Sequence, residues 1–276
     1  MFEVLKVILL GIIQGITEWL PISSTGHLIL FNDLLPLTIY QDTFANTEFV
    51  EMFMVVIQFG SILAVLLLYF KKLNPLDSRK TIEEKKETMS LWYKVVVACL
   101  PAAIIGLKYD DIIDAKLYNS TVVAIMLIVY GILFIVIESG RREIKVSDTK
   151  NLSYKQAFLV GCFQVLALIP GTSRSGATIL GGILIGLKRS VAAEFSFFLA
   201  IPVMFGASLL KLVKMEVVLN SYSISILVLG MFISFVVSIA AIKFLMGYIR
   251  KHDFKAFGYY RIVLGVIILV YYLIIK

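Results

Sequence analysis

The chain has 276 residues, of which 59% are hydrophobic and only 16% are charged. Soluble domains are about a quarter charged and about half apolar, so this composition excludes an ordinary soluble domain. The net charge of +7 raises the question of nucleic acid, but in a membrane protein it more often reports lysine and arginine in cytoplasmic loops. We therefore expect an all-α integral membrane protein that contacts membrane lipid and has no nucleic-acid partner.

The apolar stretches come in two kinds along the chain. The first, residues 2–37, exceeds one span and is interrupted at residues 21–26 by proline, serine, threonine and glycine; residues 157–187 are interrupted in the same way at 170–176. Each half is too short to cross a bilayer, so both stretches predict re-entrant helix-loop-helix pairs. Six other stretches have spanning length, near residues 53–70, 91–107, 120–137, 195–212, 223–246 and 257–275.

Lysine and arginine concentrate in alternate connections. Residues 71–86, 141–150, 188–189 and 250–255 are basic, whereas the connections between them hold little beyond Lys108, Lys116, Lys211 and Lys214. The basic set is expected in the cytoplasm. This alternation requires the first broken pair to enter from outside and the second from the cytoplasm, with both termini outside.

The two halves of the chain resemble each other. Gly11-Ile-Ile-Gln14 is matched by Gly161-Cys-Phe-Gln164, and each is followed by proline and a Ser/Thr-Gly turn. We predict one membrane domain, 1–276, with an inverted-topology repeat: about 1–138 and about 153–276, joined by a cytoplasmic linker at about 139–152. Inverted repeats with broken helices hold their site near the membrane midplane.

The two breaks predict an anion site. Ser23, and either Thr172 or Ser173, are candidate N-caps of helices that start inside the bilayer, where free N–H groups attract phosphate. An arginine at mid-membrane, Arg174, is costly unless paired and marks a functional site. Its planar fork suits phosphate oxygens. The structural alternative is an ion pair between Arg174 and Glu18 that only holds the two breaks together.

The first break also supplies reactive groups. Gln14 and Glu18 share one helix face, and Ser24 and His27 share a face of the next helix. Glu18 is a candidate base, a candidate anchor for Arg174, and a candidate ligand for Mg²⁺ or Ca²⁺. His27 is either catalytic or an ordinary buried histidine.

Further polar residues are predicted to bind the ligand, although serine and threonine also serve helix packing in membranes. These are Gln14, Ser23, Thr25, Ser173, Ser175 and Thr178. Arg261 either extends to the membrane surface or reaches inward, and the sequence leaves this choice open.

Two long motifs carry a resemblance to a known family. Residues 14–27, Gln-Gly-Ile-Thr-Glu-Trp-Leu-Pro-Ile-Ser-Ser-Thr-Gly-His, and residues 170–178, Pro-Gly-Thr-Ser-Arg-Ser-Gly-Ala-Thr, resemble the signatures of the bacterial undecaprenyl-diphosphate phosphatase, or bacitracin-resistance, family. The likeness covers the whole chain. It implies a plasma-membrane enzyme, its site open to the outer side, that hydrolyses undecaprenyl diphosphate to undecaprenyl phosphate and phosphate. This recycles the lipid carrier for cell-wall synthesis and confers bacitracin resistance.

The resemblance also implies a divalent cation, with Glu18 the leading ligand. The family's first motif begins with Glu or Gln; this chain has Gln14, so Glu18 alone must carry any carboxylate role there. For a phosphatase, Glu18, Ser24, His27 and Arg174 are the catalytic candidates. Ser24 is the favoured nucleophile, with His27 and an activated water as alternatives.

Two other classes of function compete with an enzyme. A transporter or flippase for an anionic lipid or a phosphorylated solute has the same architecture of inverted repeats and broken helices. A non-catalytic assembly protein leaves Arg174 unexplained. The sequence also leaves the oligomeric state open, with a homodimer among the alternatives.

Overall fold

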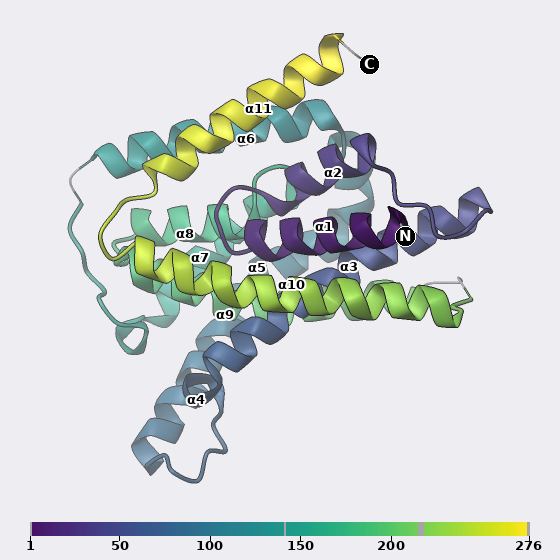
Figure 1. Ribbon diagram of the computed structural model, residues 1–276. Coiled ribbons are helices and arrows are strands. Elements are labelled where there is room, and N and C mark those ends of the chain that lie inside the picture. The colour runs from purple at the N-terminus through teal and green to yellow at the C-terminus, as the bar shows by residue number, and fades with distance from the viewer. Residues whose placement is uncertain (1, 141, 215–217, 275–276) are drawn as a thin grey trace.

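The computed structural model describes residues 2–140, 142–214 and 218–274, which contain eleven α-helices and no β-strand (Figure 1). Arg141 lies outside the described residues, as do the side chains of Lys211 and Lys214. The helices are α1 (Phe2–Thr17), α2 (Ser24–Leu34), α3 (Thr43–Leu68), α4 (Phe70–Leu73), α5 (Ile82–Leu117), α6 (Ser120–Ser139), α7 (Tyr154–Val165), α8 (Arg174–Leu184), α9 (Arg189–Lys214), α10 (Ser221–Tyr248) and α11 (Lys255–Ile274). Short 3₁₀ turns, η1 (Thr149–Asn151) and η2 (Leu166–Leu168), precede and follow α7.

Six described helices are long and apolar enough to cross a membrane, which confirms the predicted count. They are α3, α5, α6, α9, α10 and α11, with spanning parts Thr43–Leu68, Ile82–Tyr109, Ser120–Ser139, Arg189–Gly206, Ser221–Tyr248 and Lys255–Ile274. The chain is therefore a multi-pass membrane protein.

Several helices start earlier than the hydrophobic stretches predicted. Helix α3 begins at Thr43 because the Asp42 side chain accepts a hydrogen bond from the Ala45 amide. Before α5, Thr81 and Glu84 exchange side-chain and backbone hydrogen bonds, as in a capping box. Hydropathy reports the part of a helix that can enter lipid, whereas polar caps decide where the helix begins.

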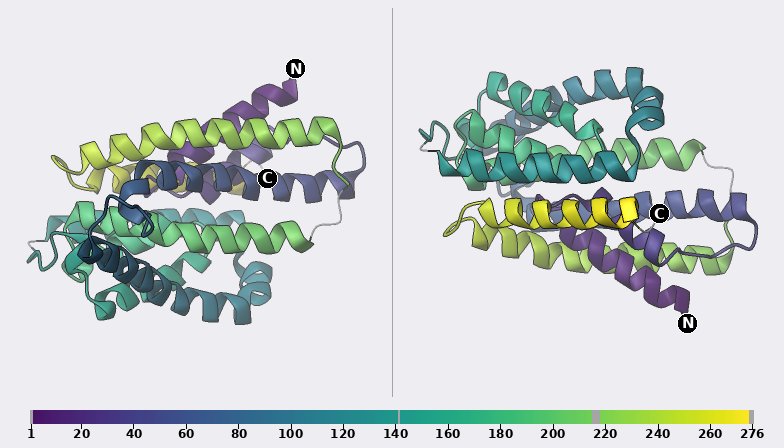
Figure 2. Two further views of the ribbon diagram at one scale, coloured as in Figure 1. Left: turned by 90° about the horizontal axis from the view of Figure 1, so that it is seen from below. Right: turned by 90° about the horizontal axis from the view of Figure 1, so that it is seen from above.

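The two interrupted stretches form two pairs of short helices, α1–α2 and α7–α8. These helices have 16, 11, 12 and 11 residues, too few for any one to span about 30 Å of hydrocarbon. Helix α1 packs along α10, and α7 packs along α5 (Figures 1 and 2). The first helix of each broken pair thus packs on a long helix of the other half of the chain. The re-entrant path of the pairs, the inverted orientation of the halves and the domain boundaries stay predictions.

Glycines let helix backbones approach closely at these contacts. A Cβ on Gly161 of α7 would lie 2.2 Å from the Ala98 carbonyl oxygen of α5, and one on Gly60 of α3 would lie 2.2 Å from that of Met231 in α10. No larger side chain fits without moving the helices. Small residues at helix contacts are typical of membrane proteins.

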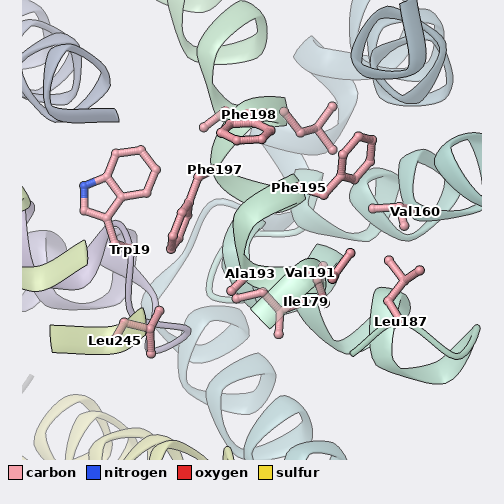
Figure 3. Close-up of a cluster of buried hydrophobic side chains, with 14 of the residues drawn as sticks. Trp19, Val160, Ile179, Leu187, Val191, Ala193, Phe195, Phe197, Phe198 and Leu245 are labelled. Carbon is pink, nitrogen blue, oxygen red and sulfur yellow. The ribbon is translucent and has the colours of Figure 1, made fainter. Parts of the chain in front are cut away.

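A buried aromatic cluster anchors the first break to α9. Trp19, which follows α1, is fully buried and meets Phe197 edge-to-face at 5.2 Å between ring centroids (Figure 3). Phe195 and Phe198 of α9 lie in the same cluster. Glu18, immediately before Trp19, is thereby held close to the polar residues of α9.

Candidate active site

Two serines set the geometry of the two breaks. Ser23 (φ 73°) and Ser173 (φ 71°) are the only non-glycine residues with positive φ in the described chain. Their side-chain oxygens accept hydrogen bonds from the amides of Gly26 and Gly176, at 3.3 and 3.1 Å. The predicted N-cap of α2, Ser23, is thus confirmed, and of the two candidates for α8 the structure selects Ser173. A strained backbone of this kind costs about 1–3 kcal/mol per residue and is concentrated at functional sites.

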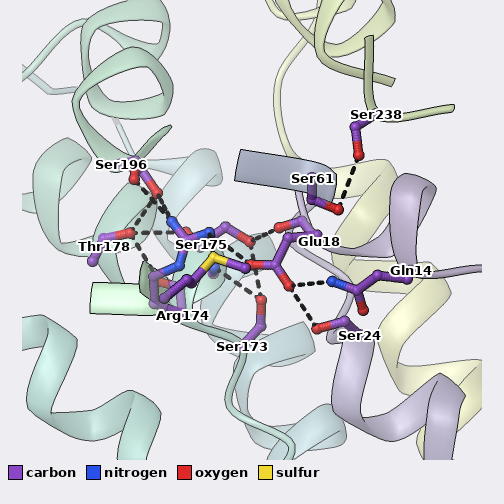
Figure 4. Close-up of polar contacts among 12 residues, drawn as sticks. Gln14, Glu18, Ser24, Ser61, Ser173, Arg174, Ser175, Thr178, Ser196 and Ser238 are labelled. Carbon is purple, nitrogen blue, oxygen red and sulfur yellow. Dashed lines mark hydrogen bonds and ion pairs between the residues drawn. The ribbon is translucent and has the colours of Figure 1, made fainter. Parts of the chain in front are cut away.

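The Glu18 carboxylate is the meeting point of the two breaks (Figure 4). Its Oε1 accepts a hydrogen bond from Nη2 of Arg174 at 2.7 Å. Its Oε2 accepts from Nε2 of Gln14 and from Oγ of Ser24, each at 3.1 Å. The structure therefore brings three of the sequence candidates, Gln14, Ser24 and Arg174, around the buried carboxylate of a fourth, Glu18.

The Arg174 guanidinium is fixed from several sides. Its Nη1 donates to the Ser196 carbonyl at 2.8 Å and lies 3.3 Å from the Ser196 hydroxyl, and its Nη2 lies 3.7 Å from Sδ of Met204. The group also sits 5.7 Å from the Trp19 ring centroid. Its Nε is buried and has no partner in the described residues. Buried donors are rarely left unpaired, which distinguishes Nε from the other N–H groups of this guanidinium.

The hydroxyls of α8 are occupied by the protein itself. Ser175 Oγ donates to the Glu18 carbonyl at 3.1 Å, and Thr178 Oγ1 donates to the Arg174 carbonyl at 2.8 Å while lying 2.7 Å from the Ser196 hydroxyl. These bonds tie α8 to the first break and to α9. Thr172 is no N-cap, and its Oγ1 is buried without a partner in the described chain.

His27 belongs to a different part of the site. Its Nδ1 lies 2.7 Å from the Ser23 carbonyl, which can only accept, so Nδ1 carries a proton. Its Nε2 lies 2.6 Å from the Tyr260 hydroxyl, and the two rings are stacked. No hydrogen bond joins His27 to Ser24 or Glu18 in the described residues. Thr25 lies half-buried near the start of α2.

Sequence reasoning missed Ser196 and Tyr260 and left Arg261 open. Nothing in the local pattern around Ser196 or Tyr260 distinguishes them from other polar residues of spanning helices. Arg261 turns inward: it is fully buried and donates to the carbonyls of Pro21, Gly171 and Thr172. The sequence feature that pointed to Arg261 was the presence of an arginine inside an apolar helix.

The oxygen atoms suited to a divalent cation are few. No group of three or more His, Cys, Asp or Glu side chains that could hold a metal occurs in the described residues. Glu18 is accompanied by Gln14, whose Oε1 is buried and without a partner there. Carboxylate and amide oxygens both suit Mg²⁺ and Ca²⁺. The residues fit a cation only if substrate and water supply the rest of its shell.

Comparison with known proteins identifies the family. The family model described as bacitracin resistance protein BacA matches residues 7–267. The chain belongs to this family. A relative from Enterococcus faecalis, named undecaprenyl-diphosphatase, is 59% identical over 273 residues, 97% of each chain. One of the same name from Acetivibrio thermocellus is 57% identical over an alignment of 278 positions that covers 100% of each chain.

A third relative, undecaprenyl-diphosphatase 1 from Clostridioides difficile, is 55% identical over 275 residues, which are 100% of this chain and 98% of the relative. The family resemblance predicted from the two motifs is thus confirmed. In this member of the BacA family both motifs contribute to one cluster of side chains around Glu18. The catalytic and binding roles of the individual residues stay predictions.

Proposed function

We propose that this protein is an undecaprenyl-diphosphate phosphatase, which hydrolyses the lipid diphosphate to undecaprenyl phosphate and inorganic phosphate. The activity recycles the lipid carrier for cell-wall synthesis and confers bacitracin resistance. Membership of the BacA family and the name of the relatives support the activity. The single structural observation that carries the proposal is the contact of Glu18 with both Ser24 and Arg174, between the N-termini of α2 and α8.

The enzyme works in the bacterial plasma membrane, with its site open to the outer side. The concentration of lysine and arginine in alternate connections supports this orientation. In this orientation the α1–α2 pair enters the membrane from the outside.

The substrate diphosphate binds between the two serine-capped helix N-termini. The amides at the start of α8 and Nε of Arg174 donate to the terminal phosphate. Glu18 and Ser196 hold the Arg174 guanidinium in place before substrate arrives. Donors that are already oriented stabilise charge on the equatorial oxygens without reorganisation during the reaction.

Ser24 is the proposed nucleophile, because its hydroxyl already donates to Glu18 at 3.1 Å. Ser24 Oγ attacks the terminal phosphorus, its proton passes to Glu18, and undecaprenyl phosphate leaves. Glu18 passes this proton to the leaving undecaprenyl phosphate and is again ionised, so it can take a proton from the water that hydrolyses the phosphoserine and releases phosphate. An attack by His27 Nε2 requires that the ring first leave the Tyr260 hydroxyl, and direct attack by water is the remaining alternative.

A divalent cation, Mg²⁺ or Ca²⁺, is proposed to bind Glu18 and Oε1 of Gln14. Bound there, it would neutralise part of the diphosphate charge. The buried amide oxygen without a partner supports this position.

The isoprenyl tail has an apolar route from the site. A groove of about 270 Å³ is lined by Val56, Phe59, Phe205, Ser208, Leu209 and Met231. It continues the face of α9 that carries Met204, because residues four apart in a helix share a face. Met204, one helical turn from Ser208 of the groove, contacts Arg174, and this proximity supports the proposal that the tail leaves through the groove into lipid.

One assay separates the phosphatase from the transporter. Purified protein in detergent, given undecaprenyl diphosphate and Mg²⁺ or Ca²⁺, is expected to release inorganic phosphate. A protein that binds the lipid diphosphate but releases no phosphate under either cation is instead a lipid-binding or lipid-moving protein.

A further inference from the structure

The side chain of Arg261 in α11 donates hydrogen bonds to both breaks. Its guanidinium is fully buried. Nη1 donates to the carbonyl of Pro21 in the first break at 3.1 Å, and Nη2 donates to the carbonyls of Gly171 and Thr172 in the second break, each at 2.9 Å. One side chain therefore holds the peptides that lead into both N-cap serines.

These carbonyls have no other main-chain partner. Pro21, Gly171 and Thr172 lie outside the helices, and none of their oxygens accepts a backbone hydrogen bond in the described residues. Inside a bilayer an unpaired carbonyl is strongly unfavourable. Arginine carries five N–H donors in a planar fork and no acceptor, whereas lysine concentrates its three donors on one atom. The guanidinium suits this spread of acceptors better than any other side chain.

The Arg261 charge has no carboxylate partner among the described residues. Its other neighbours are the Leu127 and Met126 carbonyls of α6, at 3.4 Å, and the ring of Tyr130, at 5.5 Å from the centroid. By contrast, Glu18 balances the charge of Arg174. The site therefore keeps one unbalanced positive charge before substrate binds.

This charge lies close to the proposed phosphate site. A Cβ on Gly176, whose amide donates to Ser173, would be 3.1 Å from Nη1 of Arg261. The bond to the Thr172 carbonyl also polarises the peptide that carries the Ser173 amide, because hydrogen bonds on one peptide reinforce each other. Both effects favour an anion at the start of α8.

We propose that Arg261 is a positioning residue for the phosphatase reaction. It holds the two N-cap turns in register, and its unbalanced charge attracts the diphosphate without touching it. This inference rests on the proposed function of the site. Arg261 makes two separable contributions. The planar set of N–H donors fixes the positions of the two N-cap turns, and the positive charge favours binding of an anion.

Two substitutions separate the contributions. Arg261→Gln removes the charge and keeps some N–H donors, whereas Arg261→Lys keeps the charge and loses the planar arrangement of donors. The matched control is Arg79→Gln, since the Arg79 side chain is 71% exposed and paired with Asp77 far from the breaks. Each purified variant is measured for thermal unfolding, for the dissociation constant of inorganic pyrophosphate by calorimetry, and for kcat and KM on undecaprenyl diphosphate.

For Arg261→Gln we expect the pyrophosphate dissociation constant and KM to rise at least about tenfold, because a charged interaction in a buried site is lost. For Arg261→Lys we expect pyrophosphate affinity within about threefold of the original and a kcat at least about tenfold lower. Arg79→Gln stays close to the original in all three measurements. A folded Arg261→Gln protein with unchanged pyrophosphate affinity overturns the proposal, as does an equal loss of affinity in both Arg261 variants.

Gly176→Ala covers the case in which the Arg261 variants do not fold. Its added methyl group would lie 3.1 Å from Arg261 Nη1 and 3.2 Å from Cβ of Ser173, whereas Gly26→Ala, at the equivalent place in the first break, would meet the Leu127 side chain at 3.2 Å. Gly176→Ala is expected to weaken pyrophosphate binding more than Gly26→Ala does at equal thermal stability, and an equal effect overturns the proposal. Pyrophosphate binding is measured without catalytic turnover. If the unsubstituted protein released no phosphate from undecaprenyl diphosphate, that result would reject the proposed function, whereas the binding data would still test the role of Arg261.

Discussion

Nη2 of Arg174 lies 2.7 Å from Oε1 of Glu18, although 156 residues separate the two in the chain. Both side chains are nearly buried, with 12% and 8% of their surfaces exposed. A buried ion pair of this kind is compatible with catalysis and with a purely structural link between the breaks. The first two predictions distinguish these roles.

Glu18→Gln is expected to lower kcat for phosphate release by about 10²-fold or more, because a positioned general base contributes that much. The amide has almost the same shape as the carboxylate, but it leaves the Arg174 charge without its partner, so thermal stability should fall as well. The measurement is phosphate release from undecaprenyl diphosphate, with circular dichroism to verify folding. Glu143→Gln, in an exposed part of the linker, is the matched control. Near-normal turnover in Glu18→Gln would remove Glu18 from catalysis.

Arg174→Met is expected to destabilise the protein, since removing one partner of a buried ion pair leaves the other charge unpaired at a cost of about 3–5 kcal/mol. The double substitution with Glu18→Gln removes both charges and should recover much of the loss in thermal stability. Activity should not recover in the double variant. If stability and activity return together, the pair serves only to hold the breaks.

Ser24→Ala is expected to abolish formation of a phosphoenzyme, because the attacking oxygen is removed. The measurement is trapping with terminally labelled substrate, followed by acid quench and peptide mapping. His27→Ala should still form the intermediate, since no hydrogen bond joins His27 to Ser24 in the described chain. Label on His27, or a Ser24→Ala protein that turns over normally, would exclude Ser24 as nucleophile.

Ser208→Phe is expected to fill the apolar groove and raise KM for the C55 substrate about tenfold, because excluding even two buried methylene groups costs about 1.6 kcal/mol. A short-chain prenyl diphosphate, which needs less of the groove, should show a smaller change. The ratio of KM values for the two substrates is the readout. An equal change for both chain lengths would place the tail elsewhere.

Gly161→Ala is expected to lower stability by about 1–3 kcal/mol, as overpacking a close contact does, because its methyl group would lie 2.2 Å from the Ala98 carbonyl oxygen. Gly247→Ala in α10 is the control: nothing lies within 4 Å of its added Cβ, and alanine is the better helix former. Thermal unfolding in detergent compares the two. A Gly161→Ala protein as stable as Gly247→Ala would mean that α7 does not pack closely on α5.

Local sequence patterns were enough to predict the spanning helices and part of the candidate site. The six spanning helices follow from stretches of apolar residues, which act through their immediate contact with lipid. Ser23 was recognisable as an N-cap, and Ser173 as one of two candidates beside Thr172, because a cap bonds to an amide only three residues away. The Glu18–Arg174 contact was foreseeable as an alternative, since a mid-membrane arginine needs a partner and few acids were available.

Long-range packing decided which residues distant in the sequence contact the candidate site. The sequence could not tell whether Arg261 reaches inward, because that depends on two breaks about 90 and 240 residues away. The same is true of Ser196, which meets Arg174 only when α9 packs on α8, and of Tyr260, which meets His27 only when α11 reaches α2. Hydropathy and capping are properties of neighbours along the chain. The partners of a buried polar group are chosen by the folded arrangement that leaves the fewest donors and acceptors unpaired.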